Sequence, residues 1–212
     1  MSELWLSNLI PMIKIAVISP HAPILLPKVG SNQDRHKLQK TLKSLEKLGE
    51  KMQKEKAEEI IISSPHQDWG FNVPLFFLAQ NFKGKITTFL TGPQSAQEHF
   101  VMGQKMAQSL DTKRAYALIA SGDLSHVLKA NGPYGYHPEG PKFDRELIKL
   151  LEEKKVPEIL VLDDKFPAAA DCGLRSFAFV FGLLNKEKVT IKPKILSYEG
   201  PFGVGYLVAQ IV

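Results

Sequence analysis

Two short apolar runs of this chain end in the same triplet, Ser-Pro-His, and this repetition constrains both the fold and the place of a site. The run Ile13–Ile18 leads to His21, and the run Ile60–Ile62 leads to His66. Runs rich in β-branched residues that stop at a turn signal indicate buried strands. Because open α/β sheets bind ligands in the crevice at the carboxyl ends of their strands, both histidines are expected to lie there.

Two further runs end in a similar way. The run Tyr116–Ala120 is followed by Asp123 and His126, and the run Lys194–Ser197 is followed by Glu199. All four runs have the composition of buried strands. Histidine and carboxylate side chains therefore leave several strand ends that can meet at one edge of a sheet.

Helical stretches alternate with these runs. From Gln33 to Lys56, leucines recur at steps of three and four residues, which predicts an amphipathic helix. The other predicted elements are helices at Ser95–Leu110, Phe143–Glu153 and Cys172–Leu184 and strands at Lys85–Leu90 and Gly205–Ile211. This alternation indicates a single-domain three-layer α/β/α sandwich with a mostly parallel or mixed central sheet. Residues 1–11 are interpreted as an N-terminal extension, and residues 12–212 as the folded domain.

Charge and composition exclude several classes of protein. The 212 residues carry a formal net charge of +5, but lysines in the stretch Lys37–Lys56 are interleaved with glutamates, which is typical of a solvated helix face. No apolar stretch approaches the roughly 18–20 residues that cross a bilayer, and no secretory signal is recognised. Cys172 is the single cysteine, so an intrachain disulfide is excluded. We expect a cytoplasmic protein that binds neither nucleic acid nor membrane.

The two Ser-Pro-His turns favour a metal site. A proline before each histidine restricts the backbone, and a neutral imidazole is a common metal ligand. Glu199 precedes a loop rich in glycine, where a carboxylate would be costly to bury without a cation. Two imidazoles and one carboxylate are the ligand set of non-heme ferrous iron. An exposed turn glutamate and two hydrogen-bonded structural histidines are the alternative.

The remaining candidates have more than one interpretation. His126 is suited to move protons near neutral pH, or it is a third nitrogen ligand with Glu199 behind it. His137 lies in a loop that either folds over the pocket or forms a surface turn. Cys172 is expected to be a buried packing residue, and His99 is expected at the surface. The chain has no dinucleotide fingerprint and no nucleophile elbow.

Taken together, these motifs resemble a known family. They are Ile18-Ser19-Pro20-His21-Ala22-Pro23, Ser64-Pro65-His66, Ser121-Gly122-Asp123-Leu124-Ser125-His126, Asp171-Cys172-Gly173-Leu174-Arg175-Ser176 and Tyr198-Glu199-Gly200-Pro201-Phe202-Gly203-Val204-Gly205-Tyr206. The combination is similar to the catalytic subunit of class III extradiol ring-cleavage dioxygenases, a superfamily that includes the Memo-like proteins. The similarity runs from about Ile13 to the C-terminus and is greatest to the Memo-like branch associated with AMMECR1-type and radical-SAM proteins.

The resemblance implies a set of roles. His21, His66 and Glu199 would bind Fe(2+), with zinc or another divalent metal as a substitute, and His126 would be the acid/base. Asp123, His137 and Cys172 are the candidates for residues that surround these ligands.

The resemblance also implies an activity. Residues 12–212 would be the catalytic domain of an iron(II)-dependent extradiol dioxygenase that acts on a catechol or aminophenol with dioxygen. The alternative is a Memo-like protein that binds a metal or a partner without ring cleavage. A homo-oligomer or an AMMECR1-type partner is compatible with either function.

Overall fold

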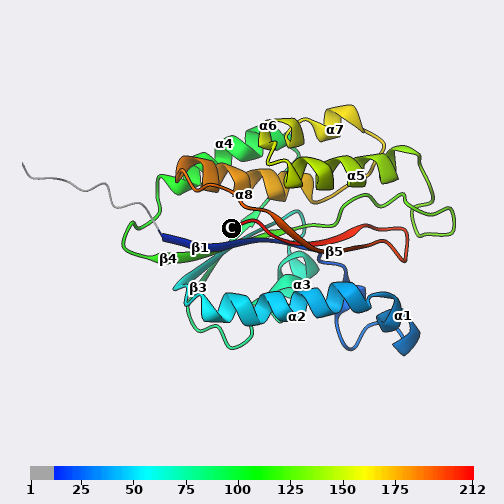
Figure 1. Ribbon diagram of the computed structural model, residues 1–212, viewed down its shortest axis with the longest axis horizontal. Helices are drawn as coiled ribbons and strands as arrows, with labels where there is room; N and C mark the ends of the chain where they lie inside the picture. Colours follow the sequence, from blue (N-terminus) through cyan, green and yellow to red (C-terminus); the bar gives the residue numbers. More distant parts are fainter. Residues whose placement is uncertain (1–11) are drawn as a thin grey trace, which may run out of the picture.

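A six-stranded mixed sheet forms the centre of the computed structural model, which describes residues 12–212 (Figure 1). The strands are β1 (Met12–Ser19), β2 (Glu59–Ser64), β3 (Lys85–Leu90), β4 (Ala115–Ser121), β5 (Lys194–Glu199) and β6 (Tyr206–Gln210). Their order across the sheet is β3-β2-β4-β1-β6-β5. Strands β3, β2, β4 and β1 are parallel neighbours, whereas β6 is antiparallel to both β1 and β5. The interpretation of residues 1–11 as an extension lies outside the described residues.

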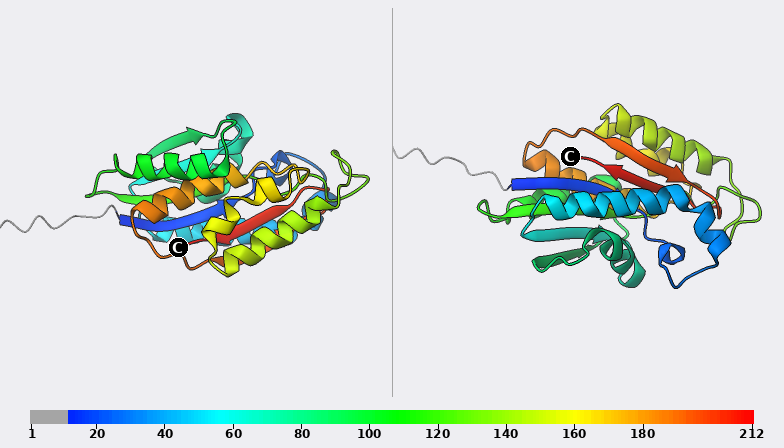
Figure 2. Two further views of the ribbon diagram at one scale, coloured as in Figure 1. Left: turned by 90° about the horizontal axis from the view of Figure 1, so that it is seen from above. Right: turned by 60° about the horizontal axis from the view of Figure 1, so that its bottom comes forward.

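Helices cover both faces of the sheet and confirm the three-layer sandwich (Figure 1). One face carries α2 (Gln39–Lys54) and α3 (Asp68–Leu78), with α1 (Asn32–Lys37) and the short helix η1 (Pro23–Leu25) beyond its end. The other face carries α4 (Ala96–Ala107), α5 (Glu139–Glu152), α6 (Val156–Ile159), α7 (Leu162–Lys165) and α8 (Leu174–Lys186). Figure 2 shows α4 and α8 packed side by side on this face. No helix within residues 12–212 combines the length and apolar character needed to cross a bilayer.

The central strands are buried on both faces, which explains why their sequences are continuously apolar. In β1, Ala16 and Ile18 pack into the core beneath α8, while Ile15 and Val17 pack into the core beneath α2. All four side chains are fully buried. Burying a side chain of the size of valine or isoleucine stabilises the fold by about 1.5–3 kcal/mol. The strand therefore holds its carboxyl end firmly, and the turn that follows begins from a rigid base.

The helix predicted over residues 33–56 is two helices. Ser31 and Asp34 form a capping box at the start of α1, which ends at Lys37. At Leu38, φ is −103° and ψ is 12°, and α2 begins at the next residue with its leucines buried on one face. Leu38 itself offers no side-chain cap, so the first turn of α2 needs a partner from elsewhere in the fold.

Two predictions about single elements were wrong or missing. His99 is fully buried and not at the surface, with Nε2 accepting from the Gly92 backbone and Nδ1 donating to the Ser95 carbonyl. Helix α3 was not predicted, since Gly70 and Pro74 interrupt its sequence. Both residues become important at the site, because α3 packs next to the turn that carries a predicted ligand.

Candidate metal centre

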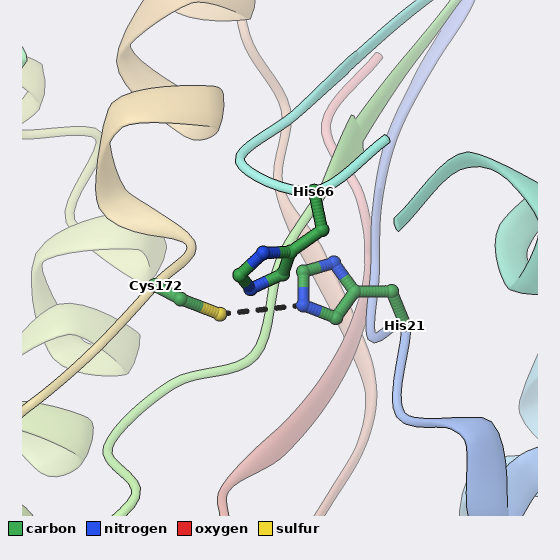
Figure 3. A group of neighbouring side chains, drawn as sticks. All are labelled: His21, His66 and Cys172. Atoms are coloured by element: carbon green, nitrogen blue, oxygen red, sulfur yellow. Dashed lines mark hydrogen bonds between the residues drawn. The ribbon is translucent and has the colours of Figure 1, made fainter. Parts of the chain in front are cut away.

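His21 and His66 meet at the carboxyl ends of the parallel strands. His21 follows β1, His66 follows β2, and their ring centroids are 5.1 Å apart. The third member is Cys172, just before α8 (Figure 3). One ligand atom from each of these three residues lies within 4.8 Å of the other two. The predicted proximity of the two histidines is therefore present in the structure.

A second group overlaps the first. Asp123 and His126 follow β4, and their ligand atoms lie within 4.8 Å of each other and of Cys172. Strand β4 lies between β2 and β1, so three adjacent parallel strands end at the same place. The sheet order thus explains why these turns converge. Cys172 is shared by the two groups and lies at their centre.

The side chain of His21 is held from several sides. Its backbone N–H donates to Asp123 Oδ1 at 3.0 Å, and its ring Nδ1 lies 3.0 Å from Ser121 Oγ. Ring Nε2 lies 3.3 Å from Cys172 Sγ and 3.9 Å from Asp123 Oδ2. Burial, together with the nearby His66 and His126, lowers the pKa of His21 to about 3. The ring is therefore neutral near pH 7, which is the form that binds metals.

Burial makes the acidic groups beside His21 harder to ionise. Burial raises the pKa of the Asp123 carboxyl to about 7 and raises the pKa of the Cys172 thiol well above its ordinary value. A thiolate–imidazolium pair of the kind used by cysteine hydrolases is thus disfavoured at neutral pH. A metal ion would reverse this balance, because it stabilises both the thiolate and the carboxylate.

The donor atoms fit a transition-metal ion. Zinc binds imidazole nitrogen at about 2.1 Å and thiolate sulfur at about 2.3 Å, which places two such ligands about 3.6 Å apart in a tetrahedral site. The separation of 3.3 Å between His21 Nε2 and Cys172 Sγ is close to that value. Imidazole and thiolate together suit zinc, copper and iron better than magnesium or calcium.

Glu199 is not part of this cluster, although the sequence leads us to expect it as a ligand. Glu199 Oε2 accepts hydrogen bonds from the backbone N–H of Thr41 at 2.8 Å and from Thr41 Oγ1 at 2.7 Å. Thr41 lies in the first turn of α2, the helix that has no side-chain cap of its own. The carboxylate therefore caps α2 from β5 and interacts favourably with the positive end of its dipole. Strand β6 lies between β5 and β1, and Glu199 belongs to neither group of donor atoms found within residues 12–212.

His126 lies beside the cluster, and one of its ring nitrogens is in a hydrogen bond with the backbone. Nδ1 donates to the carbonyl of Ala170 at 2.6 Å, and burial lowers the pKa of the ring. Ala170 has a φ of 53°, an uncommon backbone conformation for a residue with a side chain. This backbone aims its carbonyl at His126 just before Cys172.

His137 lies outside both ligand groups. Its Nδ1 accepts from the backbone N–H of Glu139, so it helps to cap the start of α5. The loop that contains it is joined to the cluster through Tyr134, whose ring meets the ring of His126 edge to face at 5.1 Å. His137 was expected around the ligands, and the hydrogen bond that its side chain makes in the structure is at the start of α5.

Two exposed aromatic side chains flank the cluster. Trp69 is 43% exposed, and its ring lies 5.1 Å from that of His66 at an angle of 35°. Tyr134 is 64% exposed, and its ring contacts that of His126. Large exposed aromatics next to buried polar groups are typical of ligand sites. Trp69 follows His66 by three residues, but its role had no signal in the sequence.

Comparisons with known proteins identify the family and the fold of this chain. Residues 67–209 match the family described as the catalytic LigB subunit of aromatic ring-opening dioxygenase. This range contains Asp123, His126, Cys172 and Glu199, and it begins one residue after His66.

Two similar proteins carry names that state no activity. Protein CA_C1420 of Clostridium acetobutylicum is 41% identical over 147 residues, which are 68% of this chain but only 31% of that protein. The chain therefore spans about a third of the length of this relative. An uncharacterized protein of Escherichia coli K12, JW3007, has the same fold, with a TM-score of 0.59, 16% identity and coverage of 94% of this chain and 100% of that chain. The family match over residues 67–209 establishes that this chain belongs to the family of catalytic LigB subunits of aromatic ring-opening dioxygenases.

Proposed function

We propose that this chain binds one transition-metal ion through His21, His66 and Cys172. The observation that carries the proposal is the meeting of three donor atoms within 4.8 Å, with His21 Nε2 and Cys172 Sγ 3.3 Å apart. The neutral state of His21 and the burial of the neighbouring acids support it, since both favour a bound cation over an empty polar cluster.

The donor set differs from the two histidines and one carboxylate of a typical ferrous site. Glu199 is hydrogen-bonded to Thr41, and the carboxylate nearest to His21 Nε2 is Asp123, at 3.9 Å. A thiolate ligand favours zinc, iron or copper in the order set by availability and geometry. When bound, such an ion would supply Lewis-acid chemistry and, for iron or copper, one-electron chemistry.

The surrounding residues have roles that do not depend on the identity of the ion. Asp123 accepts the backbone N–H of His21 and so orients the turn that presents its ring. His126 is held by the Ala170 carbonyl, and an imidazole in this place is suited to accept or donate a proton beside the cluster.

A titration of metal-free protein with Co(II) in the absence of oxygen tests the metal site. We expect a thiolate-to-cobalt absorption band that reaches its plateau at one equivalent, because one sulfur is available in the cluster. Zinc added afterwards should abolish the band by displacing cobalt. A wild-type protein that shows no such band, or that binds cobalt without sulfur, would refute the proposed ligand set.

Ring opening of a catechol or aminophenol is the second candidate function. The family match favours it, as do the exposed aromatic side chains that contact His66 and His126. The test is oxygen uptake by iron(II)-loaded protein with a panel of catechols and aminophenols. If the protein bound cobalt but the iron(II)-loaded protein took up no oxygen with any compound of the panel, the metal site would stand and the ring-opening activity would be excluded.

Replacing Trp69 with leucine is expected to weaken the binding of a chromophoric catechol to the metal-loaded protein by about 2- to 10-fold, the usual contribution of an aromatic contact. The metal affinity should not change, because Trp69 is not a donor. Phe76→Leu is the matched control, since Phe76 lies on the same helix and is also 43% exposed. Spectroscopic titration measures the catechol affinity of both variants. An equal loss of affinity in Trp69→Leu and Phe76→Leu would contradict the prediction.

A further inference from the structure

Helix α3 contains a backbone carbonyl that its own helix cannot satisfy. In an α-helix the carbonyl of residue i accepts from the N–H of residue i+4. Gly70 is four residues before Pro74, and proline has no N–H. Gly70 is also buried, so water does not take the place of the missing donor. A buried carbonyl of this kind needs a partner from another part of the fold.

Ser121 is that partner. It is the last residue of β4 and is fully buried, and its hydroxyl donates a short hydrogen bond to the Gly70 carbonyl. Helix α3 is held closely against the site at this point, because a Cβ on Gly70 would lie 2.1 Å from Ser64 Oγ and 2.9 Å from His66 Cβ. The position of the acceptor is therefore fixed relative to β4.

The direction of this hydrogen bond determines the state of His21. A serine hydroxyl has one proton, and here that proton points to the Gly70 carbonyl. Towards His21 Nδ1, which is 3.0 Å away, Ser121 Oγ can then only accept. We infer that Ser121 places the proton of His21 on Nδ1 and so leaves the lone pair of Nε2 facing Cys172 Sγ. The opposite arrangement would leave the Gly70 carbonyl buried without a donor.

This inference rests on the metal site proposed above and makes Ser121 a positioning residue. A metal-binding histidine usually donates its other ring N–H to a fixed acceptor, and loss of that acceptor costs about 10- to 100-fold in metal affinity. The acceptor here is the Ser121 hydroxyl. Its own proton is directed to the Gly70 carbonyl, because Pro74 in helix α3 offers that carbonyl no N–H. Pro74 thus acts on the site through Gly70 and Ser121, although it is not itself a proposed ligand.

The experiment compares Ser121→Ala with Ser63→Ala. Ser63 is an equally buried serine at the end of the adjacent strand β2, and its hydroxyl bonds to Ser176 and not to a histidine. Nitrogen-15 NMR of the metal-free wild type should show His21 protonated at Nδ1. In Ser121→Ala the Nε2–H form should appear, and zinc affinity should fall about 10- to 100-fold. Ser63→Ala should change neither quantity.

Two further variants separate positioning from general damage to the fold. Ser121→Thr keeps the hydroxyl and should restore the Nδ1–H form, while Pro74→Ala supplies a competing N–H to Gly70 and should increase the Nε2–H form. A wild-type His21 protonated at Nε2, or equal zinc affinity in Ser121→Ala and Ser63→Ala, would overturn the inference. If His21 of the wild type were protonated at Nδ1 but the protein bound no zinc, the metal site would be refuted and the role of Ser121 in placing the proton would stand.

Discussion

Replacing Cys172 with alanine is expected to weaken zinc and cobalt binding by more than about 100-fold, because loss of a ligand costs more than loss of a residue that orients one. Cys172 Sγ belongs to both groups of donor atoms at the site. Its removal also leaves His21 Nε2 without the contact at 3.3 Å. The measurement is competition against a chromophoric chelator, with the wild type titrated under the same conditions.

Glu199→Ala is the informative comparison. We expect this variant to keep its metal affinity and to lose about 1–2 kcal/mol of unfolding free energy, since it removes the cap of α2 that Glu199 provides through Thr41. Urea unfolding of the metal-free protein measures the loss. If Glu199→Ala lost the metal while Cys172→Ala kept it, Glu199 and not Cys172 would be the third ligand, as the sequence leads us to expect.

The unfolding free energy of the metal-free protein is expected to fall as the pH rises from about 4 to about 8, and Asp144→Asn should remove a large part of this dependence. Asp144 is 1% exposed on α5, and burial raises the pKa of its carboxyl from 3.8 to about 7. Its oxygens accept from the Ser125 backbone N–H and from the Tyr198 hydroxyl, which oppose the rise without cancelling it.

The sign follows from proton linkage. Between the ordinary pKa and the raised one, the folded protein binds a proton that the unfolded chain releases, so raising the pH destabilises the fold. A shift of this size corresponds to an effect on the order of 2 to 4 kcal/mol. Asparagine keeps an acceptor for Ser125 and cannot ionise. Asp164→Asn, at an exposed position on α7, is the control. Equal pH dependence in the wild type and Asp144→Asn would show that Asp144 ionises normally.

Most of the fold could be predicted because its signals are local. The central strands are continuously apolar and end at proline or glycine turns, and α2 has leucines at helical spacing. Such patterns depend on residues that are close in the chain, so a sequence displays them directly. The histidines His21, His66 and His126 could be placed at strand ends for the same reason.

Helix α3 could not be predicted from those signals. Its sequence contains Gly70 and Pro74 and is apolar around much of its circumference, with Val73 and Phe77 buried and Phe76 exposed. Helix propensity argues against it. It forms because it packs on the sheet beside α2 and because Ser121, from a distant strand, satisfies the carbonyl that Pro74 leaves without a donor.

The sequence by itself established an α/β sheet with histidines at the carboxyl ends of its strands, and it correctly indicated that these histidines gather. Only the tertiary structure decided whether the Glu199 carboxylate or the Cys172 thiol lies beside these histidines. A strand-end motif says that a side chain leaves the sheet at a given edge, but not which strands are neighbours. Strand β6 lies between β1 and β5, so Glu199 is carried to α2, whereas the start of α8 brings Cys172 to His21.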